Sequence, residues 1–255
     1  MNMQEIKAAY QALDPDDVLQ LQQFIQLYES DARSGVQTIV GQTRKKLDQL
    51  RAEYERSKKM LAFENQYHAM GYKYICGIDE VGRGPLAGPV VACAVILPVD
   101  EMILHLNDSK QVPRKKREIL YDIIREKAAA YGIGVVSEKR IDEINILQAT
   151  YEAMRMAISN LKVTPDLLLN DAVKIPQVDI KQIPIVKGDT LSASIAAASI
   201  VAKVTRDRMM VEYDKVYPGY DFASNMGYGS AKHYAGLDQF GPCEIHRRTF
   251  IKGYV

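Results

Sequence analysis

Acidic residues close three apolar, strand-like runs of this sequence. Asp79 and Glu80 end the run 74–81, Asp171 ends the run 166–171, and Asp189 follows the run 185–188. Burying such carboxylates is costly unless cations or hydrogen bonds satisfy them. Converging carboxylates are also the ligands that hard cations such as Mg²⁺ or Mn²⁺ prefer. The pattern therefore indicates a divalent-metal site, although the Asp79–Glu80 pair alone would equally suit a solvated turn at a strand end.

The adjacent acids Asp79 and Glu80 raise a geometric problem. Consecutive side chains on a regular strand point to opposite faces, so both cannot reach one site from an ideal strand. We therefore expect the backbone to bend or bulge there. Gly82 and Gly84 follow at once, and glycine tolerates the dihedral angles that such a bend needs.

The glycine loop after these acids does not match the common nucleotide-binding motifs. Gly82, Gly84 and Gly88 are spaced one residue too widely for the dinucleotide fingerprint, and no Gly-Lys-Ser or Gly-Lys-Thr follows. Backbone N–H groups in a turn beside Arg83 can still bind a sugar hydroxyl or a phosphate oxygen at close range.

Two other chemistries are disfavoured. Cys243 and His246 have a ligand-like spacing, but no second pair completes a zinc site. Ser192, Ser194 and Ser199 lie near Lys203, yet no nucleophile-elbow signature accompanies them. We interpret this stretch as a helix face of small residues that lies close to the sheet or to a ligand.

Basic and aromatic residues gather in the last third of the chain. Each one alone is expected to be a solvated surface residue. As a group near the glycine-rich segment 225–229 they would suit a nucleic-acid backbone and a stacking contact. They are Lys203, Arg206, Arg208, Tyr228, Lys232, His233, Tyr234, Arg247 and Arg248.

Composition excludes several classes of protein. The 255 residues have a net charge of +1, so any nucleic-acid surface must be local rather than a basic coat. The three cysteines are too few for a disulfide framework and indicate buried thiols in a reducing compartment. No signal-peptide pattern is present, and the longest apolar run, 89–98, is too short to span a bilayer. We expect a cytoplasmic protein.

From residue 72 onward, short β-rich runs alternate with helical stretches. Strands are predicted at 74–81, 90–97, 133–137, 167–172 and 183–186, and helices at about 113–130, 145–161, 191–214 and 230–239. A hairpin followed by alternating strands and helices predicts an α/β fold with a mixed central sheet flanked by helices.

Residues 1–70 differ in texture and predict a helical N-terminal extension. Asp14 and Pro15 are typical of a helix start, for a helix that continues to about Tyr28. A heptad-like stripe follows between Val36 and Leu61. We favour an amphipathic helix that packs on its neighbour or on the main body over a dimerising coiled coil, because the stripe includes Thr43 and Ser57.

Several motifs in series resemble bacterial type 2 ribonuclease H, ribonuclease HII. The resemblance covers about residues 72–250. It rests on GIDEVGRGPLAGPV at 77–90, DSK at 108–110, GD at 188–189, SIAAASIVAKVTRD at 194–207, GYG at 227–229 and IHR at 245–247.

The resemblance implies a ribonuclease H-like catalytic domain over residues 71–255, whose helical C-terminal part helps to bind the duplex. It implies that Asp79, Glu80, Asp171 and Asp189 are the catalytic and metal-binding acids. Substrate-binding roles are implied for six further residues. Gly82, Arg83 and Gly84 would sense the ribose 2′-hydroxyl, Tyr228 would lie against the sugar on the DNA side of the junction, and Lys110 and Lys203 would hold phosphates.

The implied reaction is hydrolysis of the phosphodiester 5′ to a ribonucleotide in duplex DNA, or of the RNA strand in an RNA–DNA hybrid. The products would carry a 3′-hydroxyl and a 5′-phosphate, and two Mg²⁺ or Mn²⁺ ions would assist. We expect a monomer that serves ribonucleotide and primer removal. No general acid is assigned, and His233 is not given that role.

Two rival hypotheses remain at this point. A type 3 ribonuclease H shares the expected fold but has a different glycine loop and another N-terminal domain. A hybrid-binding protein without catalysis would not need all four acids.

Overall fold

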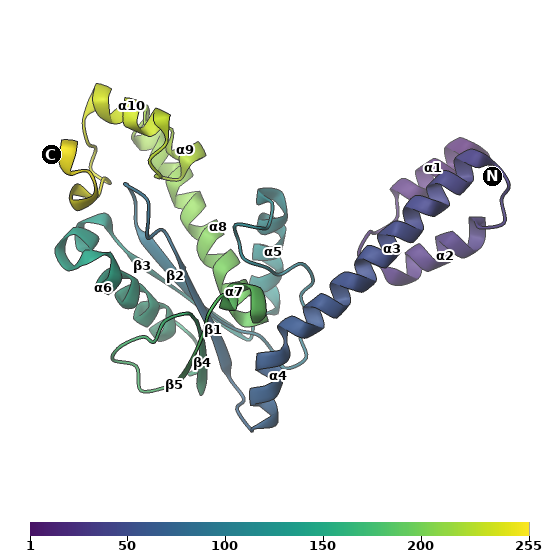
Figure 1. Cartoon of the computed structure of the whole chain (residues 1–255), viewed down its shortest axis with the longest axis horizontal. Coiled ribbons are helices and arrows are strands. Elements are labelled where there is room, and N and C mark those ends of the chain that lie inside the picture. Colours follow the sequence, from purple (N-terminus) through teal and green to yellow (C-terminus); the bar gives the residue numbers. More distant parts are fainter. Residues whose placement is uncertain (255) are drawn as a thin grey trace. The chain divides into compact units, whose positions relative to one another are not determined.

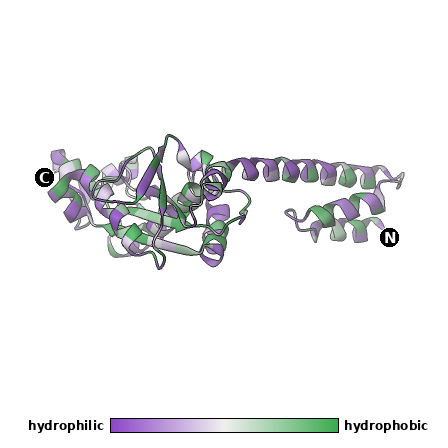
Figure 2. Cartoon of the chain, turned by 90° about the horizontal axis from the view of Figure 1, so that it is seen from below, coloured by the Kyte–Doolittle hydropathy of each residue, from purple (hydrophilic) through white to green (hydrophobic). Residues whose placement is uncertain are grey.

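The computed structural model describes residues 1–254, and the chain divides into two compact units, Met1–Lys59 and Met60–Val255. The first unit contains α1 (Met3–Gln11), α2 (Val18–Tyr28) and all but the last residue of α3 (Ser34–Met60). Side chains from the three helices form one core, with Ile6, Phe24, Val36 and Val40 among its buried residues. The predicted amphipathic helix therefore packs on its neighbours in this unit, and Figure 2 shows the alternation of hydrophobic and hydrophilic residues along α3.

The start of α2 differs from the predicted one. Asp17, and not Asp14, caps the helix, because its side chain accepts hydrogen bonds from the N–H groups of Leu19 and Gln20. Asp14 instead accepts from Asp16 N–H inside the preceding turn. Of the candidate carboxylates, the one nearest the helix satisfies its free N–H groups.

The second unit is built on the mixed sheet that the sequence predicted. Its strands are β1 (Ile75–Val81), β2 (Val90–Ile96), β3 (Ala130–Val136), β4 (Leu167–Asp171) and β5 (Lys181–Ile185), in the order β3-β2-β1-β4-β5 (Figure 1). The pairs β1–β2 and β2–β3 are antiparallel, whereas β4 is parallel to both β1 and β5.

Helices cover the two faces of this sheet. The alternation of side chains along β2 sends Val91 and Cys93 into a core with α5 (Arg114–Lys127) and α8 (Ala193–Val216), while Ala92 and Ala94 pack with α6 (Glu138–Ser159). The small residues of α8 allow close contact with β1: a Cβ placed on Gly77 would lie 2.1 Å from the backbone carbonyl carbon of Ser194. The expected packing role of this small-residue face is thus observed.

Two predicted helices begin close to their expected starts, and each is preceded by a helical segment that was not predicted. The helix expected at 145–161 follows a kink at Asn145 (φ 67°), whose Oδ1 accepts from the N–H groups of Leu147 and Gln148, and the segment from Glu138 precedes this kink. The helix expected at 191–214 is α8, which Ser192 caps through its side chain, and a break at Ser192 separates it from α7 (Gly188–Leu191). The break places Asp189 on a separate short helix.

The remaining elements complete the second unit. They are α4 (Ala62–Ala69), α9 (Phe222–Asn225), α10 (Ala231–Phe240) and the 3₁₀ turns Arg248–Phe250 and Lys252–Tyr254. The segments after α8 share a core with the glycine loop, which includes Ala87, Met210, Phe222 and Ile245. No helix within residues 1–254 has the length and apolarity that a membrane crossing requires.

Candidate active site

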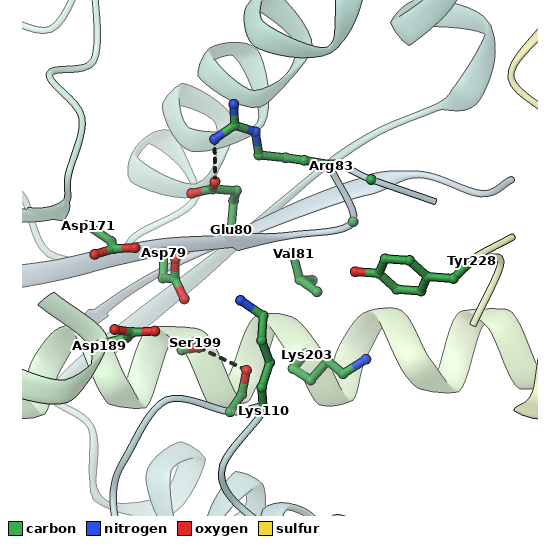
Figure 3. A pocket seen from close by; sticks show the side chains of 13 residues that line it. Asp79, Glu80, Val81, Arg83, Lys110, Asp171, Asp189, Ser199, Lys203 and Tyr228 are labelled. Atoms are coloured by element: carbon green, nitrogen blue, oxygen red, sulfur yellow. Dashed lines mark hydrogen bonds and ion pairs between the residues drawn. The ribbon is translucent and has the colours of Figure 1, made fainter. Parts of the chain in front are cut away.

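A cavity of about 740 Å³ opens at the carboxyl end of β1 and β4. All ten residues that were singled out as site residues line it, together with Val81, Ser109 and Ser199 (Figure 3). The structure therefore brings the predicted acids, glycine loop, lysines and tyrosine to one place, while their roles stay predictions.

Three of the acids face one another across this cavity. Asp79 on β1 and Asp171 on β4 both belong to the α8 side of the sheet, since they continue the alternation of Gly77 and Leu169. The short helix α7 adds Asp189, and the N–H of Gly188 in the same helix donates to Asp171 Oδ1 at 2.8 Å. Figure 3 shows the three carboxylates directed toward a common space.

Glu80 reaches the cavity in another way, and the expected bulge is absent. The register of β1 with β2 runs without interruption through Asp79↔Cys93 and Glu80↔Ala92. Pairing of β1 with β4, however, stops at Ile78↔Asn170, so within residues 1–254 β2 is the one sheet neighbour of β1 beyond this point. A regular strand whose one side is open can expose both acids without bulging. Glu80 turns away from the other acids and pairs with Arg83 at 3.2 Å (Figure 3).

Burial and mutual repulsion disfavour the ionised form of these carboxyl groups. Burial raises the pKa of Asp79 well above its usual value, and the charges of Glu80 and Asp171 raise it further. Burial likewise raises the pKa of Glu80, against the opposing effect of Arg83. The pKa of Asp189 is raised by burial and then by Asp108 and Asp171, while Lys110 lowers it. A bound cation would relieve this unfavourable charge.

The donor set fits hard divalent cations, since it consists of carboxylate oxygens that meet at a polar cavity. As the side chains stand, no three His, Cys, Asp or Glu residues in the described part of the chain are grouped tightly enough to hold one ion. Glu80 is the acid turned away, and its ion pair with half-exposed Arg83 can open at little cost. Three of these carboxylates could therefore share one cation only after rotation of their side chains.

The two predicted phosphate-binding lysines differ in their surroundings. Lys110 points into the cavity in Figure 3 and forms no ion pair among residues 1–254. Lys203 is bonded to Asp207 at 2.6 Å, one helical turn away, and Arg117 lies 3.7 Å from the same carboxylate. Lys110 is therefore the freer cation for a phosphate.

Two arginines that were expected at the surface lie in the interior. Arg206 and Arg247 are fully buried behind the loop 82–89, whereas Arg208 is half exposed and paired with Glu118. A signal in the sequence exists for Arg206: it follows Ser199 and Ala202 by seven and four residues, so it shares the helix face that lies on the sheet. No comparable periodicity marks Arg247.

Tyr228 stands at the far end of the cavity and is held from behind by histidines that sequence reasoning left without a role. The residue is 42% exposed, and its carbonyl accepts from His233 Nδ1 at 2.9 Å. His233 Nε2 in turn meets His246 Nε2 at 2.9 Å. Cys243 N–H donates to His246 Nδ1 at 3.0 Å. Burial lowers the pKa of both imidazoles, that of His246 to about 4, so both histidines of this hydrogen-bonded chain are neutral.

Comparisons with known proteins agree with this geometry. Residues 76–253 match the family model described as ribonuclease HII, and residues 2–68 match that described as ribonuclease HII N-terminal domain. The chain is 62% identical to the ribonuclease HII of Lachnoclostridium phytofermentans over 225 residues, which are 88% of each protein. It is 50% identical to that of Clostridioides difficile strain 630 over 254 residues, covering 100% of this chain and 98% of the relative.

Solved structures share the fold. Ribonuclease H2 from Pyrococcus horikoshii OT3 superposes with a TM-score of 0.57 at 27% identity, over 69% of this chain and 92% of the other. Bst-RNase HIII in complex with Mn²⁺ superposes with a TM-score of 0.51 at 17% identity, over 68% and 65% of the two chains.

The mixed sheet, with carboxylates at the open end of β1 and β4, and the matches to curated relatives together identify a metal-dependent hydrolase of the ribonuclease H class. Within that class, both units of the chain match models of one particular family. The chain belongs to the ribonuclease HII family.

Proposed function

We propose that this ribonuclease H cleaves the phosphodiester 5′ to a ribonucleotide embedded in duplex DNA, and the RNA strand of RNA–DNA hybrids. The products are a 3′-hydroxyl and a 5′-phosphate. One observation carries the proposal: four acids, the Gly82–Gly84 loop and Tyr228 line the same cavity. The residues proposed for catalysis thus lie beside those proposed to recognise the sugar.

Asp79, Glu80, Asp171 and Asp189 are proposed to hold the divalent cations, Mg²⁺ or Mn²⁺. When bound, two such ions lower the pKa of an attacking water and stabilise the departing 3′-oxygen. The chain itself supplies the alignment of the carboxylates. Gly188 N–H fixes Asp171, and Asp79 is buried between β1 and Ser199 of α8, whose hydroxyl opposes the rise in its pKa.

The rest of the cavity is proposed to recognise the substrate. The N–H groups of the Gly82–Gly84 loop take the ribose 2′-hydroxyl, the group that distinguishes RNA from DNA. Tyr228 packs on the neighbouring deoxyribose. Lys110 holds a phosphate, and Lys203 does so after exchanging its partner Asp207. In the cell we propose a monomeric, cytoplasmic enzyme of ribonucleotide and primer removal.

The direct test uses a duplex DNA with one ribonucleotide and a label at each end of that strand. We expect a single cut on the 5′ side of the ribonucleotide, only when Mg²⁺ or Mn²⁺ is present, and no cut in the all-DNA duplex. Cleavage confined to long hybrids would instead favour a type 3 activity. Binding without any cleavage under every metal condition would favour the non-catalytic alternative.

A further inference from the structure

Arg206 and Arg247 are buried cations without acidic partners. Both side chains are fully buried, and neither forms an ion pair with a carboxylate among residues 1–254. Burial lowers the pKa of Arg206 to about 10 and that of Arg247 to about 9. Burying a guanidinium is costly unless its donors are satisfied. Backbone carbonyl groups satisfy them here, and nearly all belong to the glycine loop.

Arg247 holds the start and the end of that loop at once. Its Nη2 donates to Gly82 O at 2.5 Å, Nη1 to Arg83 O at 3.0 Å and Nε to Gly88 O at 2.9 Å. The fixed fork of the guanidinium allows one side chain to span these carbonyls, which a lysine ammonium cannot do.

The inward carbonyls determine where the loop N–H groups point. In a planar trans peptide the N–H is directed opposite to the C=O, and no cis peptide occurs in the described chain. Because Gly82 O and Arg83 O point at Arg247, the N–H groups of Arg83 and Gly84 point away from it, toward the cavity that residues 82–84 line. Neither N–H has an acceptor within residues 1–254. They form a pair of free donors beside the acids.

Arg206 joins this loop to the segment that carries Tyr228. Its Nε donates to Pro89 O at 2.8 Å, Nη2 to Ala87 O at 3.0 Å and Nη1 to Met226 O at 2.8 Å, two residues before Tyr228. The fit is close, since a Cβ on Gly82 would lie 2.4 Å from Arg206 Nε. Leu86 N–H also donates to Gly227 O at 2.8 Å.

We propose that Arg247 and Arg206 are positioning residues for ribose recognition: Arg247 turns the Arg83 and Gly84 N–H groups toward the 2′-oxygen of the substrate, and Arg206 fixes their distance from Tyr228. This inference rests on the proposed function. Since N–H groups donate to a phosphate oxygen as readily as to a hydroxyl oxygen, the test must separate the two.

The test compares binding of two duplexes, identical except for one 2′-hydroxyl, measured by fluorescence anisotropy in EDTA so that nothing is cut. We use the full chain with Arg247→Met, Arg247→Lys, Arg206→Met and, as the control, Arg155→Met. Arg155 also donates to a backbone carbonyl, Pro176 O at 3.4 Å, but lines no part of the cavity. For both Arg247 variants we expect the preference for the ribonucleotide duplex to fall about tenfold, with weaker loss on the all-DNA duplex.

Arg247→Lys keeps the buried charge and serves where Arg247→Met does not fold, as judged by thermal unfolding. Folded Arg247 variants that retain the wild-type preference, or that lose affinity equally for both duplexes, would overturn the inference. A wild-type protein without any ribonucleotide preference would instead contradict the proposed function. For Arg206→Met we expect the preference to fall together with loss of the Tyr228 effect in a double-variant cycle, and additive effects would remove the link to Tyr228.

Discussion

The fold does not stabilise the ionised form of individual acids in the cavity. Burial, Glu80 and Asp171 together hold the pKa of Asp79 far above that of a free aspartate. A site of this kind stores unfavourable electrostatic energy until a cation enters, which is typical of functional rather than structural carboxylates. At such a site, metal binding is expected to be coupled to the release of protons.

We predict that metal binding releases protons. A carboxyl with a raised pKa keeps its proton to higher pH, and metal ligation requires the deprotonated form. Metal affinity should therefore fall as pH falls toward the raised pKa values. Calorimetric titration of Mn²⁺ in buffers of different ionisation enthalpy measures the released protons, and heats that do not depend on the buffer would contradict this expectation.

Tyr228 is the second residue with a separable effect. Its exposed ring borders the loop, since a Cβ on Gly84 would lie 3.6 Å from its Cε1. Tyr228→Ala should lower kcat/KM at a single ribonucleotide by about tenfold, through loss of a stacking contact, with a smaller effect on affinity for plain DNA. Tyr228→Phe is the control and should retain most activity. Equal losses on both duplexes would mean that the ring only supports the fold.

At the scale of elements, the sheet and its helices followed from periodicity and the boundaries did not. All five strands overlap their predicted ranges, and β1, β2 and β4, in the middle of the sheet, are almost entirely buried, which explains their apolar runs. The starts near Asn145 and Ser192 were predicted, whereas the helical segment from Glu138 to the kink and the short helix α7 were not, because one or two turns of helix carry little periodicity. The acids were predictable for the same reason as the strands, since they end them. Arg247 contacts carbonyl groups more than 150 residues away, and no pattern in the sequence marks it, whereas Arg206 at least shares the periodicity of the buried face of α8. The pairing of His233 with His246 likewise depends on the fold, which brings them together.

The contact between β1 and α8 gives a prediction at this scale. Gly77→Ala places a methyl group 2.1 Å from Ser194 carbonyl carbon and must separate the strand from the helix. We expect unfolding by urea to show that the free energy of unfolding falls by about 3 kcal/mol. This is the upper end of the range for overpacking, because the added methyl group clashes with backbone atoms. Gly253→Ala, which meets nothing within 4 Å, is the matched control. Equal stability of the two variants would show that the close contact is not required.

At the scale of the molecule, the compact units divide at Lys59–Met60, eleven residues before the boundary expected from composition. The difference concerns α4, whose Glu64 is buried in the second unit. Glu64 Oε1 accepts from Ser192 Oγ at 2.6 Å and from Ser194 N–H at 2.9 Å, which fastens α4 to the start of α8. A carboxylate at a helix N-terminus is stabilising there.

We therefore predict different outcomes for two truncations. Residues 60–255 should unfold cooperatively and retain metal-dependent cleavage, since their core and cavity are complete. Residues 72–255 lack Glu64 and also Met60 and Leu61 of the main core, and should be less stable than residues 60–255 by about 4 kcal/mol or more, because apolar packing is lost and buried donors at the start of α8 lose their acceptor. Calorimetry and the single-ribonucleotide assay measure both. Failure of the longer fragment to fold would show that the first 59 residues are part of the catalytic body.

The central claim, that the four acids act as one metal-dependent hydrolytic site, is tested most directly with Asp79→Asn on the one-ribonucleotide duplex. The control is Asp179→Asn, an exposed aspartate outside the cavity. Removing a buried carboxyl whose pKa is raised should leave the metal-free protein at least as stable as the wild type at neutral pH, because a group with a raised pKa in the folded state opposes folding at pH values above its ordinary pKa. We predict that this well-folded variant binds the duplex as the wild type does, while kcat falls by about a thousandfold or more. Undiminished turnover in Mg²⁺ by folded Asp79→Asn would contradict the account.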